Sequence, residues 1–275
     1  MRPDMQPDAD PGEFLLGNNY TNPFGGNYLG DIPREIGTNA TYAAMRVLEQ
    51  DVPAFEDFLS RAGSRFNLHP EVVAAKLMGR WRNGTPLTLA PQLTTDASGN
   101  PAQPTVDNGK LNKFDYAPTA GNPAYFDDAD GMRCPIGSHI RRLNPRSALV
   151  MGKPHSRRII RSGMSYGPVF DPTDPTSADK ERGLIGYFIC GDLELQFEFL
   201  LQVWANMDMS TAGIRGTSDP ILGFQSPHGG QFVLRTEQRN DPVIFTSIPQ
   251  LTWTRGSIYV FMPGIQGLKF LGSLG

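Results

Sequence analysis

A strand pattern followed directly by a helix pattern occurs twice in this sequence, and this repeated order limits the fold more than any other feature. Residues 41–50 (TYAAMRVLEQ) alternate in polarity as a strand does, and residues 51–63 continue with helical spacing. Residues 182–190 (RGLIGYFIC) are predicted to be a buried strand, and residues 191–207 carry the clearest helical pattern in the chain. The sequence therefore predicts a protein of mixed α and β structure.

Each predicted helix has an apolar face, and most have a recognisable start. Asp51 is a candidate cap for the first helix, and Gly191 or Asp192 for the last. A further helix is predicted over residues 70–81, with Pro70 in its first turn. The apolar positions are Phe55, Phe58 and Leu59 in the first helix, Val73, Leu77 and Trp81 in the second, and Leu193, Phe197, Leu200, Leu201 and Trp204 in the last.

The rest of the chain is rich in turns, with 30 glycines and 24 prolines. Residues 83–130 form a long polar insertion, and residues 250–254 and 257–263 are predicted to be two strands joined by a tight turn. This order is compatible with an α+β, ferredoxin-like domain, in which helices cover one face of an antiparallel sheet. We expect this domain to span residues 41–275, and residues 1–40 to form a tail and an irregular wrapping segment.

Charge and composition argue against several classes of protein. The net charge of −3 disfavours a protein that holds nucleic acid through its overall field. No apolar run approaches the roughly 20 residues that span a bilayer, and the N-terminus lacks the pattern of a signal peptide. Two cysteines, Cys134 and Cys190, are too few for a secreted domain stapled by disulfides. We therefore expect a soluble, cytoplasmic protein with no nucleic-acid or membrane partner.

Residues 133–161 form a strongly basic stretch that contains no Asp or Glu. Such a stretch needs an anionic counterpart or generous solvation. Three interpretations remain open: a solvated basic surface, a site for nucleic-acid phosphate, or a site for a cofactor with carboxylate or phosphate arms. The cationic residues of the stretch are Arg133, Arg141, Arg142, Arg146, Lys153, Arg157, Arg158 and Arg161.

His139 lies inside this basic stretch, with Ile136 and Ile140 nearby. A single histidine in such a place is more often a structural hydrogen-bonding residue than a ligand. The chain has four histidines, and none stands at the close spacing of a zinc site. A haem needs only one proximal histidine, so this scarcity leaves haem ligation open.

Several segments resemble the dye-decolourising peroxidase family. CPIGSHIRRLNPR (134–146) and RRIIRSGMSYG (157–167) are similar to the paired motifs of that family. The resemblance implies a ferredoxin-like domain of the dimeric α+β barrel superfamily that binds haem b (iron protoporphyrin IX), with His139 as the iron ligand and Arg161 on the distal side. Further matching pieces stand in the family's order: DPGEFLLG (10–17), KLMGRWRNGTPL (76–87), LELQFEFLLQVWAN (193–206) and TRGSIYVFMPGIQGLKFL (254–271).

The resemblance also implies an activity and further site residues. The expected activity is that of a haem-dependent peroxidase, which reduces hydrogen peroxide and oxidises dyes or phenolic and other aromatic substrates. The resemblance does not identify a carboxylate for the second ring nitrogen of His139, although such a bond gives an imidazole imidazolate character. Glu198 is our candidate; the alternative is that it is merely a polar position on an amphipathic helix. Arg141, Arg142 and Arg146 are candidates to meet the haem propionates or to hold loops.

Trp81, Trp204, Trp253 and several tyrosines could relay oxidising equivalents to bulky substrates at the surface. Aromatic residues at these spacings are more often part of the core. The sequence leaves both interpretations open.

One motif of the family is missing. Its members carry Gly-x-x-Asp-Gly, with a distal acid-base Asp, upstream of a Pro-Gly-Glu-Phe segment that here is residues 11–14, so we expect a truncated form that lacks the N-terminal half. Asp130-Gly131 does not match the motif, because Asp127 stands where its first Gly should be. Three outcomes stay open: a separate N-terminal half chain completes the peroxidase; self-association builds a different distal pocket; or the chain is a catalytically weak or inactive haem-binding, structural or partner-binding remnant.

Overall fold

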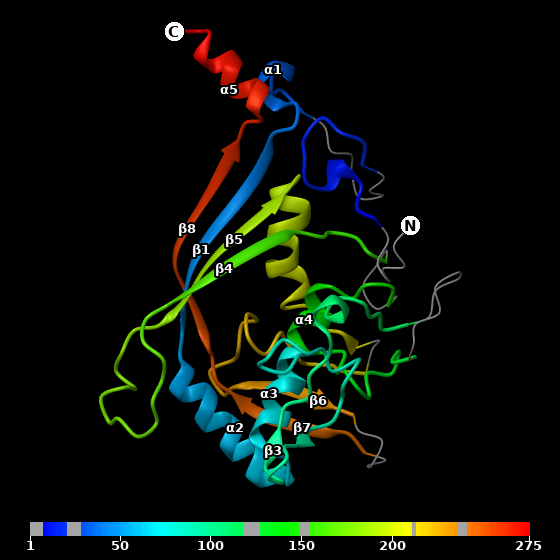
Figure 1. Ribbon diagram of the computed structural model, residues 1–275, viewed down its shortest axis with the longest axis vertical. Helices are drawn as coiled ribbons and strands as arrows, with labels where there is room; N and C mark the ends of the chain where they lie inside the picture. The colour runs from blue at the N-terminus through cyan, green and yellow to red at the C-terminus, as the bar shows by residue number, and fades with distance from the viewer. Residues whose placement is uncertain (1–7, 21–28, 118–126, 149–153, 211–212, 236–240) are drawn as a thin grey trace. The chain divides into compact units, whose positions relative to one another are not determined.

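The computed structural model describes residues 8–20, 29–117, 127–148, 154–210, 213–235 and 241–275 (Figure 1). The chain divides into two compact units, each built from separate segments. Among the described residues, unit 1 contains those of 52–155 and 202–251, and unit 2 contains those of 8–51, 156–201 and 252–275. Parts of the expected tail, wrapping segment and insertion, and Lys153 of the basic stretch, lie outside the described residues. The expected boundary near residue 40 stays a prediction.

Unit 2 is built around a four-stranded antiparallel sheet (Figure 1). Its strands, in the order in which they lie side by side, are β4 (Ile160–Tyr166), β5 (Gly183–Cys190), β1 (Thr41–Gln50) and β8 (Thr252–Met262). The two strands that come first and last in the chain therefore pair with each other, and the hairpin β4–β5 is added at one edge. This is the ferredoxin-like strand order, which confirms the α+β fold predicted from the sequence.

The C-terminal part of the sheet differs from the prediction. Residues 250–263 were expected to hold two strands around a turn at Arg255-Gly256, but β8 is a single strand that runs through both residues. Val47 of β1 lies opposite Gly256, whereas Leu48 lies opposite Thr254, so Arg255 is the extra residue of a β-bulge. A bulge accommodates the Arg-Gly pair without reversing the chain, which is why a turn signal here did not produce a turn.

The predicted helix after β5 forms, but with π-helical geometry. It consists of η3 (Leu193–Glu198) and η4 (Leu200–Trp204), and the Asp192 carboxylate caps it by accepting a hydrogen bond from the Leu195 N–H at 2.8 Å. Phe197 of η3 packs in a buried cluster with Ala44 and Cys190 of the sheet. The other helices of unit 2 are the 3-10 turn η1 (Pro11–Glu13), α1 (Arg34–Gly37) and α5 (Ile265–Gly272).

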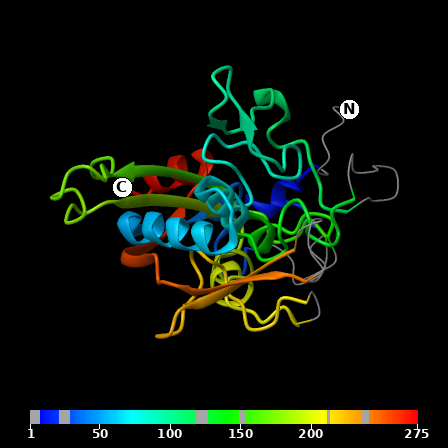
Figure 2. The same ribbon diagram turned by 90° about the horizontal axis from the view of Figure 1, so that it is seen from below.

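Unit 1 pairs two helices with a β-hairpin that the sequence did not predict. The helices α2 (Val52–Phe66) and α3 (Pro70–Met78) confirm the two amphipathic patterns. The hairpin strands are β6 (Gly230–Leu234) and β7 (Val243–Ile248), and they lie beside the helices (Figure 2). The buried side chains that join them are Phe58, Leu59, Ala62, Val73, Ala74, Leu77, Phe232, Leu234, Val243, Phe245, Ile248 and Leu251.

A glycine ends α3 in close contact with a short helix of the same unit. Gly79 has φ +93°, a left-handed conformation that terminates the helix earlier than the predicted residue 81. A Cβ at this position would lie 2.4 Å from Ile140 Cγ1 and 3.0 Å from Ser138 Oγ. Ile140 belongs to the short helix α4 (His139–Leu143), so only glycine allows α3 and α4 to approach this closely.

The long insertion holds little regular structure. Its elements are the two-residue strands β2 (Thr94–Thr95) and β3 (Pro101–Ala102) and the 3-10 turn η2 (Asn108–Lys110). Its residues Phe114 and Tyr116 still pack in a buried cluster with Trp81 and Cys134, which lie on either side of the insertion in the sequence. None of the described helices is long and apolar enough to cross a lipid bilayer.

Candidate functional site

His139 is the first residue of α4, and its imidazole is held by a buried carboxylate. The Nδ1 atom lies 3.0 Å from Oδ2 and 3.2 Å from Oδ1 of Asp219. The Asp219 side chain is fully buried, whereas 21% of the His139 side chain is exposed. Since a carboxylate can only accept, Nδ1 is the protonated nitrogen of the ring and donates this bond.

The Asp219 carboxylate is fixed from several sides. Its Oδ1 accepts hydrogen bonds from the backbone N–H groups of Ile221 and Leu222, both at 2.9 Å. Burial by itself raises the pKa of Asp219, but the facing His139 and the two N–H groups lower it more, and the net pKa lies below the ordinary value. Asp219 is therefore an ionised anchor for the imidazole.

The second ring nitrogen of His139, Nε2, makes no hydrogen bond within the part of the chain that the structure describes. A partly exposed imidazole with Nδ1 held by a carboxylate and Nε2 open is the arrangement that histidine ligands of metals adopt. Among the described residues, no group of three or more His, Cys, Asp or Glu side chains is gathered that could hold a metal ion. The donor set thus fits a single axial ligand to a haem iron.

Arg142 is buried in the interior of unit 1, close enough to Asp219 for the two charges to interact. Its Nη2 donates to Thr217 Oγ1 at 2.8 Å, and its Nη1 donates to the carbonyl oxygen of Met207 at 2.9 Å. Burial lowers the pKa of Arg142 to about 10, and the negative charge of Asp219 partly offsets this effect. Arg142 thus ties α4 to the segment that carries Asp219.

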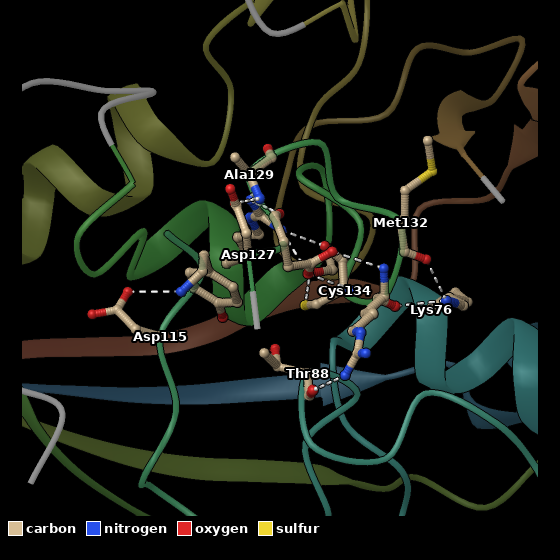
Figure 3. Close-up of polar contacts among 12 residues, drawn as sticks. Lys76, Thr88, Asp115, Asp127, Ala129, Met132 and Cys134 are labelled. Carbon is tan, nitrogen blue, oxygen red and sulfur yellow. Dashed lines mark hydrogen bonds and ion pairs between the residues drawn. The ribbon is translucent and has the colours of Figure 1, made fainter. Parts of the chain in front are cut away.

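Arg141 closes the loop that precedes α4, and Lys76 Nζ donates to the carbonyl oxygen of Met132 in the same loop at 3.2 Å (Figure 3). Its Nη1 donates to the carbonyl oxygen of Cys134 at 2.6 Å and to Asp128 Oδ2 at 3.1 Å. The same carboxylate accepts from the backbone N–H groups of Arg133 at 2.8 Å and Cys134 at 2.9 Å. From the other side of the loop, Lys76 Nζ donates to the carbonyl oxygen of Arg133 at 2.6 Å. Asp128 and Arg141 therefore form a buried ion pair that holds the loop leading into α4, which begins at His139.

Arg146 is also internal. Its Nη1 donates to the carbonyl oxygen of Phe114 at 2.7 Å, and its guanidinium lies 3.7 Å from the centre of the Phe114 ring. Arg141, Arg142 and Arg146 are 1%, 0% and 4% exposed, so these members of the basic stretch do not form a solvated surface. Of the two roles expected for them, the structure favours holding loops, because their terminal nitrogens donate to carbonyl, hydroxyl and carboxylate oxygens of the protein.

Arg161 belongs to unit 2, where it lies on the edge strand β4. Its side chain is exposed, in contrast to the three arginines around α4. In the register of the sheet it stands opposite Phe188 of β5. An exposed guanidinium on a rigid strand can bind an anionic or polar ligand without first breaking internal hydrogen bonds.

The assignment of Glu198 as the carboxylate partner of His139 is wrong. Asp219 occupies that position, and Glu198 instead accepts a hydrogen bond from the Tyr259 hydroxyl at 2.7 Å within unit 2. The helical pattern had shown only that Glu198 is a polar position on an amphipathic helix, and such a pattern does not specify which residue it meets.

Comparison with known proteins supports the family resemblance. A dye-decolorizing peroxidase of Auricularia auricula-judae is 31% identical over 248 residues, which cover 83% of this chain and 45% of that protein. The structure is similar to that of a dye-decolorizing peroxidase in complex with 2,6-dimethoxyphenol, with a TM-score of 0.71 and 26% identity over 96% of this chain and 57% of the other. The chain belongs to the dye-decolourising peroxidase family. A dye-decolorizing peroxidase with an engineered heme pocket is 28% identical, with a TM-score of 0.70 over 97% of this chain and 59% of the other.

The family members differ from this chain in length. The chain spans about half the length of the curated relatives that it matches. No family model matches the sequence. The fold and the family are therefore established by similarity to individual dye-decolourising peroxidases, and not by a family model.

Two site residues, Asp219 and Asp128, were missed by sequence reasoning. Asp219 stands in Ser218-Asp219-Pro220, and an Asp before a Pro is a turn signal, because its side chain can accept from backbone N–H groups that follow. Asp128 follows Asp127 in a polar loop with no such pattern. The turn signal could have indicated that Asp219 is fixed, but not that it faces His139.

We predict that Asp128→Ala destabilises the protein by about 3–5 kcal/mol, because it leaves the buried Arg141 guanidinium without its counter-ion. Urea denaturation measures the change in the free energy of unfolding. The matched control is Asp57→Ala, which removes an exposed ion pair with Arg61 and should cost less than about 1 kcal/mol. Equal losses in the two variants would contradict the internal role of Asp128.

Asp219→Asn should change how stability depends on pH. Since the folded-state pKa of Asp219 is lowered, its contribution is fully present above the unfolded pKa of about 3.9 and is lost as the pH falls through the folded value. The amide that this substitution introduces does not titrate, so the stability gap between wild type and variant should narrow on acidification. Urea unfolding at a series of pH values from about 7 to about 3 measures this gap, and a gap that stays constant would contradict the prediction.

Proposed function

We propose that this chain binds haem b through His139 and acts as a peroxidase, which reduces hydrogen peroxide and oxidises dyes or phenolic substrates. The observation that carries the proposal is the imidazole geometry: Nδ1 is held by the buried Asp219, while Nε2 is open in a partly exposed ring. Relatives that are named dye-decolorizing peroxidases, and a relative with a heme pocket, support the choice of cofactor and activity.

Asp219 would determine how strongly His139 donates to the iron. A hydrogen bond from Nδ1 to an ionised carboxylate gives the imidazole imidazolate character, which raises its basicity toward a metal. When bound, a haem with such a ligand supplies the redox chemistry that cleaves the peroxide bond. The protein's part on this side is to keep Asp219 ionised and the ring in one orientation.

Arg161 is proposed as the cation that stabilises negative charge on the peroxide. A guanidinium stays protonated at all ordinary pH values and can hold a departing negative oxygen. The same property makes an arginine a poor proton shuttle, because it does not release a proton near neutral pH. We therefore propose that a separate partner chain or a second copy of this chain contributes the acid that moves the proton.

The first test is haem binding. Purified protein with added hemin should show a Soret band, and His139→Ala should lose it because the iron ligand is removed. The matched control is His228→Ala, which changes an exposed histidine and should leave the spectrum intact. A Soret band that survives in His139→Ala would exclude His139 as the iron ligand.

The second test is catalysis. If a second copy of this chain supplies the acid, the haem-loaded protein should oxidise dyes in the presence of hydrogen peroxide, and Arg161→Ala should lower kcat/KM by about 100-fold or more, as expected when a cationic stabilising group is removed. Arg61→Ala, an exposed arginine on α2, should have no effect. If haem binds but no dye is oxidised from about pH 3 to about pH 8, the isolated chain is a haem-binding protein and not a peroxidase.

A further inference from the structure

The sheet of unit 2 has two edges, and they differ in how they are protected. The strand order makes β4 and β8 the two edge strands (Figure 1). An edge strand presents a row of unpaired backbone N–H and C=O groups, which another chain can pair with unless a bulge, a proline or several charges prevent it. β8 has such protection, because it contains the bulge at Arg255, whose side chain forms an ion pair with Glu49.

The edge strand β4 lacks these protections. Its seven residues, Ile160–Tyr166, pair with β5 in one uninterrupted register. Its sequence, IRSGMSY, contains no proline and only one charged residue, Arg161. Among the residues that the structure describes, β5 is the only strand that pairs with β4. The outer side of β4 is therefore a regular row of backbone donors and acceptors to which another strand can be added.

Large apolar side chains of β4 are exposed beside this edge. Ile160 is 49% exposed and Met164 is 65% exposed. Alternate residues of a strand project to the same face of a sheet, so these two side chains share one face with Tyr166. A strand that pairs with β4 would place its own side chains next to them and remove apolar surface from water. The edge thus offers side-chain contacts as well as backbone hydrogen bonds.

The sequence of β4 is complementary to itself when two copies of the strand run antiparallel. A two-fold axis at Gly163 pairs every residue of the strand with a residue of the second copy. The pairs on either side of the axis are Ile160 with Tyr166, Arg161 with Ser165, and Ser162 with Met164. No pair brings like charges together, and a β-branched side chain beside an aromatic ring is a favourable cross-strand combination.

Other pairings of two β4 strands are less favourable. A parallel pair in register places Arg161 directly beside Arg161 of the second copy, and like charges in that position are destabilising. An antiparallel pair whose axis is moved from Gly163 to either neighbouring residue leaves two residues of each strand without a partner. A two-fold arrangement is also the commonest symmetry of soluble homo-oligomers. The antiparallel pair about Gly163 is therefore the arrangement that this edge fits best.

We propose that β4 is an interface between two copies of this chain, which pair antiparallel about Gly163 and join their sheets edge to edge. The two four-stranded sheets then form one continuous sheet. A seven-residue antiparallel pair supplies about six to eight backbone hydrogen bonds between the copies. Such a contact buries less than the roughly 800 Å² per partner of a standard interface, so the dimer is reversible and depends on protein concentration.

This inference goes beyond the proposed function and does not require haem. Pairing at an edge uses backbone groups that lie in the plane of the sheet, so the side chain of Arg161 stays free on its own face. The pairing also places Ser165 of the second copy opposite Arg161. Each copy therefore contributes a hydroxyl group beside the cation that is proposed to stabilise the peroxide.

Disulfide trapping of the full chain tests the pairing and its register. Gly163 faces itself across the axis at a Cα–Cα distance of about 4.5–5.5 Å, so Gly163→Cys should give a disulfide-linked dimer on mild oxidation. The matched control is Ser165→Cys, which should give none, because the two introduced thiols are four residues, or about 14 Å, apart. The natural cysteines are buried and are the same in both variants. A Cβ at Gly163 meets only the flexible end of the Leu184 side chain, at 3.0 Å, so the fold should tolerate the change.

Met164→Lys tests the same interface without a new thiol. The axis at Gly163 brings the two Met164 side chains to diagonal positions about 7–8 Å apart, so the substitution introduces a pair of like charges. Dimerisation, measured by sedimentation velocity over a series of protein concentrations, should weaken by about tenfold, because repulsion is gained and apolar contacts are lost on both copies. The matched control is Ile258→Lys, which changes a 56% exposed residue on the same face of β8 and should leave dimerisation unchanged.

The outcomes separate this inference from the proposed function, because every measurement is made on haem-free protein. A dimer that Gly163→Cys traps, that Ser165→Cys does not trap and that Met164→Lys weakens supports the inference. Equal trapping in the two cysteine variants would overturn the pairing about Gly163. A wild type that stays monomeric at every concentration, together with no disulfide-linked dimer of Gly163→Cys, would overturn the interface and leave the edge to a strand of another protein. Neither result changes the haem-binding test of His139.

Discussion

The contact between the His139 imidazole and the buried Asp219 carboxylate is the interaction on which the candidate site depends. A carboxylate in the interior is costly unless its oxygens are satisfied. Here two backbone N–H groups and the imidazole supply that satisfaction, so one side chain stabilises the fold and sets the ring's protonation at the same time. Replacing either His139 or Asp219 would therefore disturb both the stability of this region and the protonation of the imidazole.

Buried guanidinium groups hold the surroundings of this contact in place. The loop before α4, the segment before Asp219 and the end of the insertion each direct carbonyl oxygens at an arginine. These segments have few regular hydrogen bonds of their own, so carbonyl groups would otherwise remain unsatisfied inside the protein. A planar group with five donors can bind several irregular segments together where no helix or sheet is available.

The sequence predicted the parts of this protein that depend on periodicity. The strands 41–50 and 183–190 and the helices α2 and α3 have strong local patterns, and together with the resemblance they indicated the ferredoxin-like class. The hairpin β6–β7 was missed because its partners are linked by a longer, polar connection and lack a short turn motif. His139 and Arg161 could be singled out by motif, and their roles stay predictions. Asp219 could not be paired with His139, since 80 residues separate them and only the tertiary fold brings them together. The run of arginines suggested a charged surface because composition does not report burial.

Gly79 connects the end of one helix to the direction in which the imidazole points. Because Gly79 carries no side chain, the side chains of Ile140 and Ser138 pack directly against the end of α3. The position of α4, which begins at His139, is therefore tied to the end of the nine-residue helix α3. A side chain that presents one ring nitrogen in a fixed direction needs such a stiff support. In this protein, the stiffness comes from a missing methyl group.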